Sequence, residues 1–159
     1  MEQPAVKAHL VPIYSVATDR TDMVEKVVHT DAEWQRLLTK DQFSVARKKG
    51  TEPAGTGIYA HSDEKGIYTC VCCGTDLFSS EKKFESGTGW PSFSAPVAET
   101  NVHRVADNSY GMERTEVLCS RCDAHLGHVF DDGPAPTHQR YCMNSASFRL
   151  VRGDGDHLI

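Results

Sequence analysis

The sequence predicts a mainly β fold with short helices on its N-terminal side and a four-cysteine metal site. Three observations lead to this prediction. Helix-capping signals and helical spacing of apolar residues occur together around Trp34. Beyond Gly57 the pattern changes to short β-favouring runs separated by Gly, Asp, Asn and Pro. A Cys-x-x-Cys pair also occurs twice, in a chain whose 159 residues fit one domain.

The first 29 residues mix prolines with charges, show no clean period and lack a core-sized apolar face. We expect residues 1–29 to form a loosely attached extension. Two short helices follow. Thr30 with Glu33 fits a capping box, in which each residue satisfies a backbone N–H of the other, and Thr39 with Gln42 repeats the signal. The apolar residues between the two boxes fall at helical spacing: Trp34, Leu37 and Leu38.

The remainder is expected to form an antiparallel β body. Its short runs are rich in β-branched and aromatic residues, and turn-forming residues bound them. The expected strands are 58–60, 67–70, 102–105, 115–118 and 148–151.

The charge and hydropathy of the chain argue against nucleic acids and membranes as binding partners. With 17 basic and 22 acidic residues the net charge is -5, so the basic footprint of a nucleic-acid binder is missing. No apolar run approaches the roughly 20 residues of a membrane-spanning helix. Pro12 interrupts the one run that resembles a secretion signal. We therefore expect a cytoplasmic protein without nucleic-acid or membrane partners, and a monomer by default.

The six cysteines form three groups, of which two contain a Cys-x-x-Cys turn. Such turns place two thiolates on one side of a tight loop, and four sulfurs satisfy the tetrahedral preference of structural zinc. The predicted ligands of one Zn²⁺ are Cys70, Cys73, Cys119 and Cys122. The alternative is that one pair is a redox dithiol and the other is merely buried. Cys72 interrupts the first turn and is a spare thiol or a substitute ligand.

Cys142 stands outside both turns and is the candidate nucleophile. A free cysteine is more often an inert small hydrophobe than a reactive thiol. Arg140 and Asn144, each two residues away, project to the same face of a strand, where the first could favour the thiolate and the second could donate a hydrogen bond. A purely structural strand would normally present hydrophobic residues there.

Three further residues could complete a site around this thiol. His125 and His128 follow the second cysteine turn closely, and a fixed turn would hold their imidazoles in place; the alternatives are metal ligation or surface exposure. Trp90 sits between glycines and a proline, and is either ordinary core or the wall of an apolar pocket. Cys, His and Asn together are the parts of an acid and base assisted thiol reaction.

Taken together, six segments strongly resemble the B-type peptide methionine sulfoxide reductases in order and spacing. The resemblance runs from about Thr30 to about Leu150. The segments are Cys-x-x-Cys-Gly at 70–74, GTGWPSF at 87–93, GMERTEV at 111–117, Cys-x-x-Cys at 119–122, HLGHVFDDGP at 125–134 and RYCMNSAS at 140–147.

The resemblance implies two antiparallel β-sheets with short N-terminal helices, and a catalytic domain over 30–152 between the extension and a tail at 153–159. It implies that a low-pKa Cys142 thiolate attacks the R epimer of methionine sulfoxide, in proteins or peptides, and is left as a sulfenic acid. The implied supporting residues are His125, His128, Asn144 and Arg140 as catalytic groups, and Trp90 and Phe130 as substrate-binding groups.

The sequence departs from the commonest pattern of that family at one position. Many members carry a resolving cysteine two residues before the tryptophan, where this chain has Thr88. We therefore expect thioredoxin or a small thiol to reduce the sulfenic acid of Cys142 directly, with Cys72 as a less favoured resolving thiol.

Two other classes of function fit parts of the sequence. One is a metal-clamped interaction module in which the aromatic residues bind a partner and Cys142 is a bystander. The other is a thiol hydrolase, which would need an oxyanion site that the sequence does not reveal.

Overall fold

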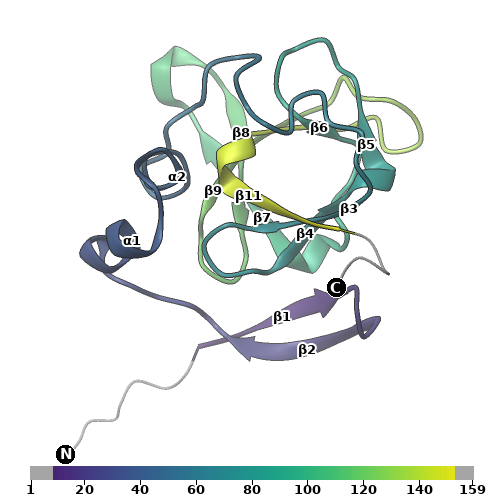
Figure 1. The fold of residues 1–159 in the computed structure, drawn as a ribbon. Coiled ribbons are helices and arrows are strands. Elements are labelled where there is room, and N and C mark those ends of the chain that lie inside the picture. Colours follow the sequence, from purple (N-terminus) through teal and green to yellow (C-terminus); the bar gives the residue numbers. More distant parts are fainter. Residues whose placement is uncertain (1–8, 153–159) are drawn as a thin grey trace, which may run out of the picture.

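The computed structural model describes residues 9–152 (Figure 1). Every strand pairing in it is antiparallel. The largest sheet has six strands, in the order β5 (Lys83–Phe84), β6 (Ser92–Phe93), β10 (Arg140–Met143), β9 (His125–Phe130), β8 (Arg114–Cys119) and β7 (Val102–Asp107). The second sheet has the order β11 (Phe148–Arg152), β3 (Gly66–Cys70) and β4 (Asp76–Ser79). The predicted mainly β fold with short N-terminal helices is confirmed.

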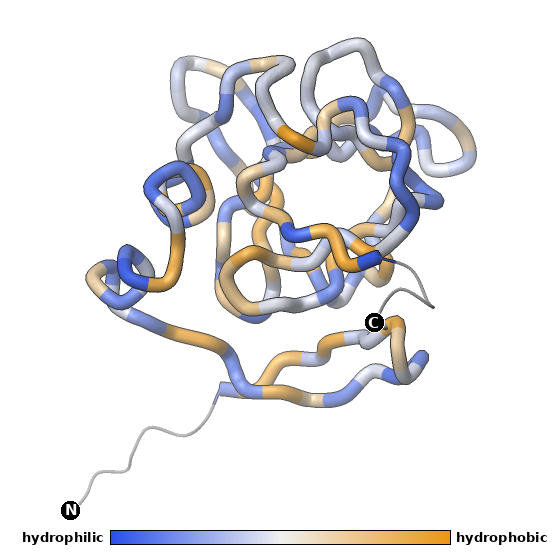
Figure 2. The backbone as a smooth tube through the Cα atoms, viewed as in Figure 1, coloured by the Kyte–Doolittle hydropathy of each residue, from blue (hydrophilic) through white to orange (hydrophobic). Residues whose placement is uncertain are grey.

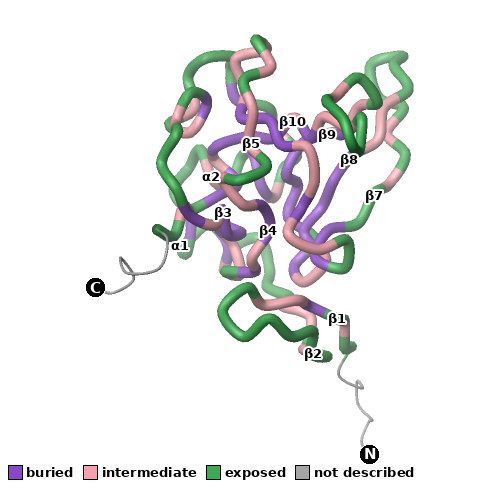
Figure 3. Tube along the Cα trace, turned by 90° about the vertical axis from the view of Figure 1, so that its right-hand side faces the viewer, coloured by how far each residue is buried: buried purple, intermediate pink, exposed green. Residues whose placement is uncertain are grey.

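The core lies between these two sheets and is rich in aromatic rings. Phe78 of β4 stacks on Phe93 of β6 with ring centroids 4.7 Å apart, and Tyr68 of β3 meets Phe93 edge to face at 5.1 Å. Such pairs contribute about 0.5–1.5 kcal/mol each beyond the area that they bury. Figure 3 shows the buried segments gathered in these strands, and Figure 2 shows apolar residues along the same strands. The aromatic contacts hold the six-stranded sheet, which carries the site, against the smaller one.

The two helices begin where the capping boxes predict. In α1 (Asp31–Leu37) the Thr30 hydroxyl accepts the Glu33 amide, and the Glu33 carboxylate accepts the Thr30 amide. In α2 (Lys40–Ala46) Thr39 and Gln42 exchange the same two bonds. Neither helix is long and apolar enough to cross a bilayer, and the same is true of every helix within residues 9–152.

Four of the five predicted strands lie within observed ones, and the fifth prediction was wrong. Residues 58–60 form a turn in which the Ala60 amide donates to the Gly57 carbonyl at 3.2 Å. Ile58 is 78% exposed, so its β-favouring side chain has no sheet to pack on. The structure adds β9 and β10, which the sequence did not delimit as strands.

The N-terminal segment is also more ordered and more firmly attached than the sequence predicts. Residues 10–25 form a hairpin of β1 (Leu10–Ser15) and β2 (Arg20–Glu25), and this hairpin is hydrogen-bonded to the body. The buried Asn101 side chain accepts from the Tyr14 amide and donates to the Tyr14 carbonyl, both at 2.8 Å. The described part of the extension is therefore attached, whereas residues 1–8 and the tail at 153–159 lie outside the described residues.

Candidate active site and metal centre

The two Cys-x-x-Cys turns have the same backbone geometry. In the first turn the Gly74 amide donates to the Cys70 carbonyl at 2.8 Å, and in the second the Asp123 amide donates to the Cys119 carbonyl at 2.8 Å. Gly74 and Asp123 both adopt positive φ, at 82° and 64°, which reverses the chain directly after each cysteine pair. The two turns therefore present their cysteines in equivalent local geometry.

The turns bring the four predicted ligands together. Their sulfur atoms all lie within 4.8 Å of one another, and the shortest separations are 3.5 Å for Cys70 with Cys122 and 3.6 Å for Cys73 with Cys119. Four sulfurs around one tetrahedral Zn²⁺ would lie about 3.8 Å apart, given Zn–S bonds of about 2.3 Å. The four-cysteine cluster therefore has the size and donor chemistry to hold one metal ion.

Cys72 is not one of the four clustered cysteines, although its half-buried thiol lies within hydrogen-bonding reach of the Cys122 and Cys70 thiols. The same thiol is near the Arg47 guanidinium, which lies 4.5 Å from the Trp34 ring and donates to the Cys122 carbonyl. Cys72 is also absent from the lining of the cavity that holds Cys142. The structure thus does not bring the less favoured resolving thiol to the candidate nucleophile.

Cys142 lies in the middle of the six-stranded sheet and opens into a small cavity. It sits opposite His128 of β9 on one side and Ser92 of β6 on the other, and it is half-buried. The cavity has a volume of about 120 Å³. Its lining residues are Thr51, Trp90, Arg114, Gly127, His128, Phe130, Cys142, Met143 and Asn144.

Burial, rather than the neighbouring cation, dominates the electrostatics of this thiol. Burial raises the pKa of Cys142 above its ordinary value, and the Arg140 guanidinium with a hydrogen bond from Thr88 only partly opposes that rise. Arg140 thus acts in the expected direction, but the expectation of a low-pKa thiolate was wrong for the substrate-free protein. The Thr88 hydroxyl, at the position of the missing cysteine, lies beside the Cys142 thiol.

Arg140 is held from two sides. Its guanidinium donates to both carboxylate oxygens of Asp132, at 2.8 and 3.1 Å, and lies 4.5 Å from the ring centroid of Phe130. A bidentate pair and a stacked ring fix the plane of a guanidinium, which a lysine could not reproduce. The cation is therefore oriented beside Cys142 before any ligand binds.

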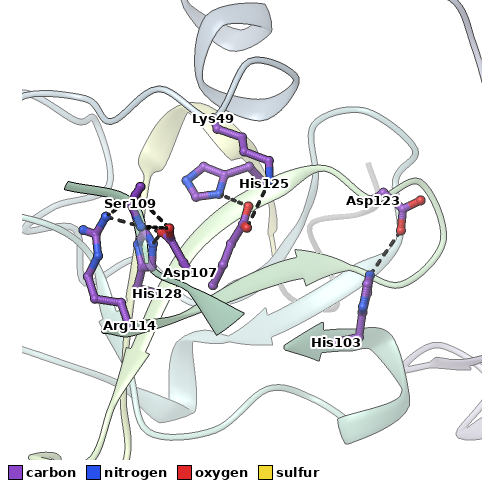
Figure 4. Close-up of polar contacts among 9 residues, drawn as sticks. Lys49, His103, Asp107, Ser109, Arg114, Asp123, His125 and His128 are labelled. Atoms are coloured by element: carbon purple, nitrogen blue, oxygen red, sulfur yellow. Dashed lines mark hydrogen bonds and ion pairs between the residues drawn. The ribbon is translucent and has the colours of Figure 1, made fainter. Parts of the chain in front are cut away.

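Each predicted histidine is paired with a carboxylate (Figure 4). His128 Nε2 lies 2.7 Å from Asp107 Oδ2, and His125 Nδ1 lies 2.7 Å from Glu116 Oε2. The bond from His128 holds the pKa of Asp107 well below its usual range. Burial lowers the pKa of His125, and Glu116 only partly offsets this. Burial therefore favours the neutral form of the His125 ring.

The two histidines do not have the same access to Cys142. His128 lines the Cys142 cavity, whereas His125 lines an adjoining cavity of about 460 Å³ that shares Thr51, Arg114 and His128 with the first. The two imidazole centroids are 5.6 Å apart. His125 can thus act on a ligand beside Cys142 only through His128 or through the adjoining cavity.

Trp90 and Asn144 both line the cavity, and both are anchored to one residue. The Trp90 indole N–H donates to the Glu52 carbonyl at 2.8 Å. The Asn144 side chain accepts the Glu52 amide at 3.0 Å and donates to the Leu126 carbonyl at 3.2 Å. The two walls are therefore fixed by backbone groups, and one of the two Asn144 amide hydrogens is already used.

Comparison with known proteins identifies the family. Residues 38–152 match the family model described as the SelR domain. The chain is 56% identical to the peptide methionine sulfoxide reductase MsrB of Hahella chejuensis over 133 residues, which are 84% of this chain and 96% of that protein. It is 54% identical to the protein of that name from Acinetobacter baylyi, over 79% of this chain and 90% of that one. The corresponding protein of Herminiimonas arsenicoxydans is 55% identical, over 80% and 93%. The chain belongs to the MsrB family.

The matched residues of the MsrB family model contain the whole site. All six cysteines, both paired histidines and Trp90 fall within 38–152. The hairpin of β1 and β2 lies before that range. The additional N-terminal structure therefore packs on a body that has the extent of an MsrB domain.

Sequence reasoning missed the acidic partners of the site. Asp107, Glu116 and Asp132 each hold a predicted residue in place, yet all three are ordinary charged residues when read along the chain. A weak signal existed for Glu116 alone, because a charged residue interrupts an otherwise β-favouring run at 115–118. Arg114, which lines the cavity and donates to Asp107 at 3.3 Å, lies just before the same run.

Proposed function

We propose that the chain reduces the R epimer of methionine sulfoxide, in proteins or peptides, to methionine with Cys142 as the attacking thiol. Methionine sulfoxide reductase activity follows from membership of the MsrB family. One observation carries the proposal for Cys142: its thiol shares a cavity with the Trp90 indole and a carboxylate-paired histidine, and the oriented Arg140 guanidinium lies beside it. The thiols of the four-cysteine cluster have no such surroundings.

The proposed step balances without an added cofactor. The Cys142 sulfur attacks the sulfoxide sulfur, and the S–O bond breaks as the oxygen is transferred to Cys142. The products are methionine, whose sulfur has gained two electrons, and a Cys142 sulfenic acid, whose sulfur has lost them. The thiol proton ends on the transferred oxygen. Two molecules of an external thiol then restore Cys142, with release of water and formation of their disulfide.

The surrounding residues supply orientation and proton handling. Burial raises the pKa of the Cys142 thiol and so disfavours the thiolate, while the Arg140 guanidinium favours the thiolate that attacks the sulfoxide sulfur. His128 Nε2 is engaged by Asp107, which leaves Nδ1 as the ring nitrogen that can accept the Cys142 thiol proton and then pass it to the sulfoxide oxygen. Trp90 and Phe130 offer apolar surface to the substrate methyl group and side chain.

We also propose that the four-cysteine cluster holds one structural zinc ion. Cys70, Cys73, Cys119 and Cys122 would be its ligands, and the metal would cross-link the two turns without taking part in the reaction. A closed site of four thiolates leaves no position for substrate. The site is therefore assigned to the stability of the fold.

The proposed reductant is thioredoxin or a small thiol. Among residues 9–152, Cys142 is the one cysteine that lines the cavity, and Thr88 occupies the position of the resolving cysteine common in the family. Mass spectrometry after one turnover without reductant should detect sulfenic acid at Cys142. A disulfide between Cys142 and Cys72 would contradict direct reduction by an external thiol.

The main test offers each epimer of a blocked methionine sulfoxide with dithiothreitol as reductant. We expect reduction of the R epimer only. The matched pair Cys142→Ser and Cys72→Ser separates the thiols, since only Cys142→Ser should abolish the reaction. Inertness of the folded wild-type protein toward both epimers would contradict the proposal, and so would full activity of Cys142→Ser.

A further inference from the structure

Glu52 is the residue through which the walls of the Cys142 cavity are joined. Its backbone carbonyl accepts the Trp90 indole N–H at 2.8 Å, and its backbone amide donates to Asn144 Oδ1 at 3.0 Å. Its buried carboxylate accepts the amides of Ser145, at 2.8 Å, and Ala146, at 3.0 Å. All four bonds reach residues more than 30 positions away, so they are contacts of the folded state rather than of a local turn.

We propose that Glu52 is a positioning residue, which sets the distance between Trp90 and the segment carrying Cys142 and Asn144, all of which line the cavity. The inference rests on the proposed function, because it assigns the cavity to the sulfoxide. The inference goes beyond the proposed function by naming the residue that fixes the geometry of the cavity. Glu52 does not line that cavity and would not touch the substrate.

The carboxylate acts on the segment that follows the nucleophile. β10 ends at Met143, and a single helical turn at Ser145–Ser147 begins directly after Asn144. The first amides of a helical turn have no partner within it, and a carboxylate that accepts two of them makes charge-assisted bonds. The carboxylate therefore fixes the position at which the chain leaves β10, two residues beyond Cys142.

Packing fixes Glu52 itself. A side chain at Gly57 would collide with the Glu52 carboxylate and with the Ser145 hydroxyl, so the carboxylate is closed in by backbone. Three residues beyond Glu52, the Gly55 amide donates to the Gly89 carbonyl at 2.7 Å, next to Trp90. The segment at 52–57 is thus bonded to the tryptophan loop on one side and to the β10 exit on the other.

A positioning role differs in its consequences from a role in stability alone. If Glu52 only stabilised the fold, its replacement would lower the melting temperature and leave each folded molecule fully active. If it sets the cavity width, replacement will alter catalysis per active site and the discrimination between a methyl and a larger alkyl group against Trp90. The first effect concerns the amount of folded protein, and the second concerns the geometry of the site.

The test compares Glu52→Gln and Glu52→Asp with the wild-type chain. Glutamine has one oxygen, so it can accept only one of the two amides and presents an N–H₂ group to the other, while aspartate is shorter by one methylene. Asp76→Asn is the matched control, because that carboxylate accepts the Val16 amide at 2.9 Å on the side of the β1–β2 hairpin. Active sites are counted by alkylation of Cys142.

Two readouts are taken from each variant. The first is kcat/KM per active site for R-methionine sulfoxide and for its ethyl analogue. The second is independent of activity: the hydrogen-exchange rate of the Trp90 indole N–H by NMR, with the other tryptophan, Trp34, as internal reference. In both Glu52 variants we expect kcat/KM for the methyl substrate to fall about tenfold or more and the methyl-over-ethyl preference to shrink. We expect the Trp90 indole to exchange at least about fivefold faster, while Asp76→Asn changes neither readout.

The outcomes distinguish this inference from the proposed function. Unchanged Trp90 exchange together with unchanged kcat/KM and selectivity per active site would overturn the positioning role, whatever the melting temperature. A wild-type protein inactive on the sulfoxide, with Trp90 exchange still accelerated by the Glu52 variants, would overturn the function and keep Glu52 as the link between the two walls.

Discussion

The two cysteine environments of this protein differ in what surrounds the sulfur. In the four-cysteine cluster each sulfur has three other sulfurs within 4.8 Å, and Cys70 and Cys119 have no exposed surface. Cys142 has no cysteine beside it in its cavity, but a tryptophan, a histidine and a threonine hydroxyl. The same side chain is thus a candidate metal ligand in one place and a candidate nucleophile in the other, and its neighbours decide which.

The difference extends to how each environment is built. The cluster joins two tight turns far apart in sequence, so it closes a long loop and contributes to the fold itself. The Cys142 cavity is a surface feature of a sheet that the core already holds, and its polar residues are fixed by carboxylates and backbone groups. We therefore expect changes at the cluster to affect stability and changes at the cavity to affect reactivity.

The largest expected effect comes from removing one ligand of the cluster. Structural zinc contributes an apparent ~10–16 kcal/mol in small metal domains, which is comparable to the whole stability of a typical domain at about 5–15 kcal/mol. Cys119→Ser should therefore release the metal and abolish the cooperative thermal transition, whereas Cys142→Ser should melt as the wild type does. Metal content per chain and near-UV circular dichroism measure the difference. A Cys119→Ser protein with the wild-type melting temperature would refute the division between the two environments.

A smaller effect is expected when the cation beside Cys142 is removed. Burial raises the pKa of this thiol and Arg140 opposes the rise, so Arg140→Met should raise the pKa further. Below the pKa the alkylation rate follows the thiolate fraction, so Arg140→Met should react several-fold more slowly than the wild-type protein. The rate of iodoacetamide reaction between pH 7 and 10 measures this, with the exposed Arg149→Met as control. A faster reaction in Arg140→Met would show that the guanidinium does not favour the thiolate.

His125 offers a test of the acidic partners that is independent of the thiol. Its pKa is already lowered by burial, and Glu116 opposes that shift, so Glu116→Gln should lower the pKa further. Because the pKa of His125 is lowered on folding, its neutral ring contributes to stability above the unfolded-state pKa of about 6.5. That contribution is lost as the pH falls through the folded-state pKa. NMR titration of the imidazole protons gives the pKa directly. A higher His125 pKa in Glu116→Gln than in the wild-type protein would show that the Glu116 carboxylate does not favour the charged ring.

What the sequence predicts correctly depends on short-range patterns. Both capping boxes are complete within four residues, and the cysteines of the four-cysteine cluster recur at one spacing, so each could be found without knowledge of the fold. The strand at 125–130 was not delimited because two histidines and Gly127 obscure its alternation. Gly127 is required there because a side chain would collide with the Cys142 carbonyl on the neighbouring strand. That cause is visible only once the strands are paired.

The acidic partners could not be predicted for a related reason. Glu116 and His125 meet across two neighbouring strands whose register shifts between Val117 and Leu118, so sequence spacing does not reveal their contact. The hairpin of β1 and β2 was missed because most of its residues are exposed and Ile13 is the one buried residue in its two strands, too little for an alternating apolar pattern. Its attachment depends on side chains such as Asn101, which lies 87 positions from Tyr14.

The smallest expected effect links that hairpin to the four-cysteine cluster. Lys26, directly after β2, donates to Asp123 at 2.8 Å and to the Ser120 carbonyl at 3.2 Å, and its side chain is only 15% exposed. Both acceptors belong to the second cysteine turn. Losing such a partly buried bond costs about 1 kcal/mol, so Lys26→Met should speed metal release to a chelator roughly fivefold.

The rate of alkylation of Cys142 should stay unchanged in Lys26→Met, because the substitution lies at the cluster and not at the cavity. Arg20→Met is the matched control, since its ion pair with Asp22 is exposed and remains within the hairpin. Equal rates of metal release in both variants would mean that the hairpin lies against the second cysteine turn without stabilising it. A changed alkylation rate in Lys26→Met would instead show that the two environments are coupled through the body of the protein.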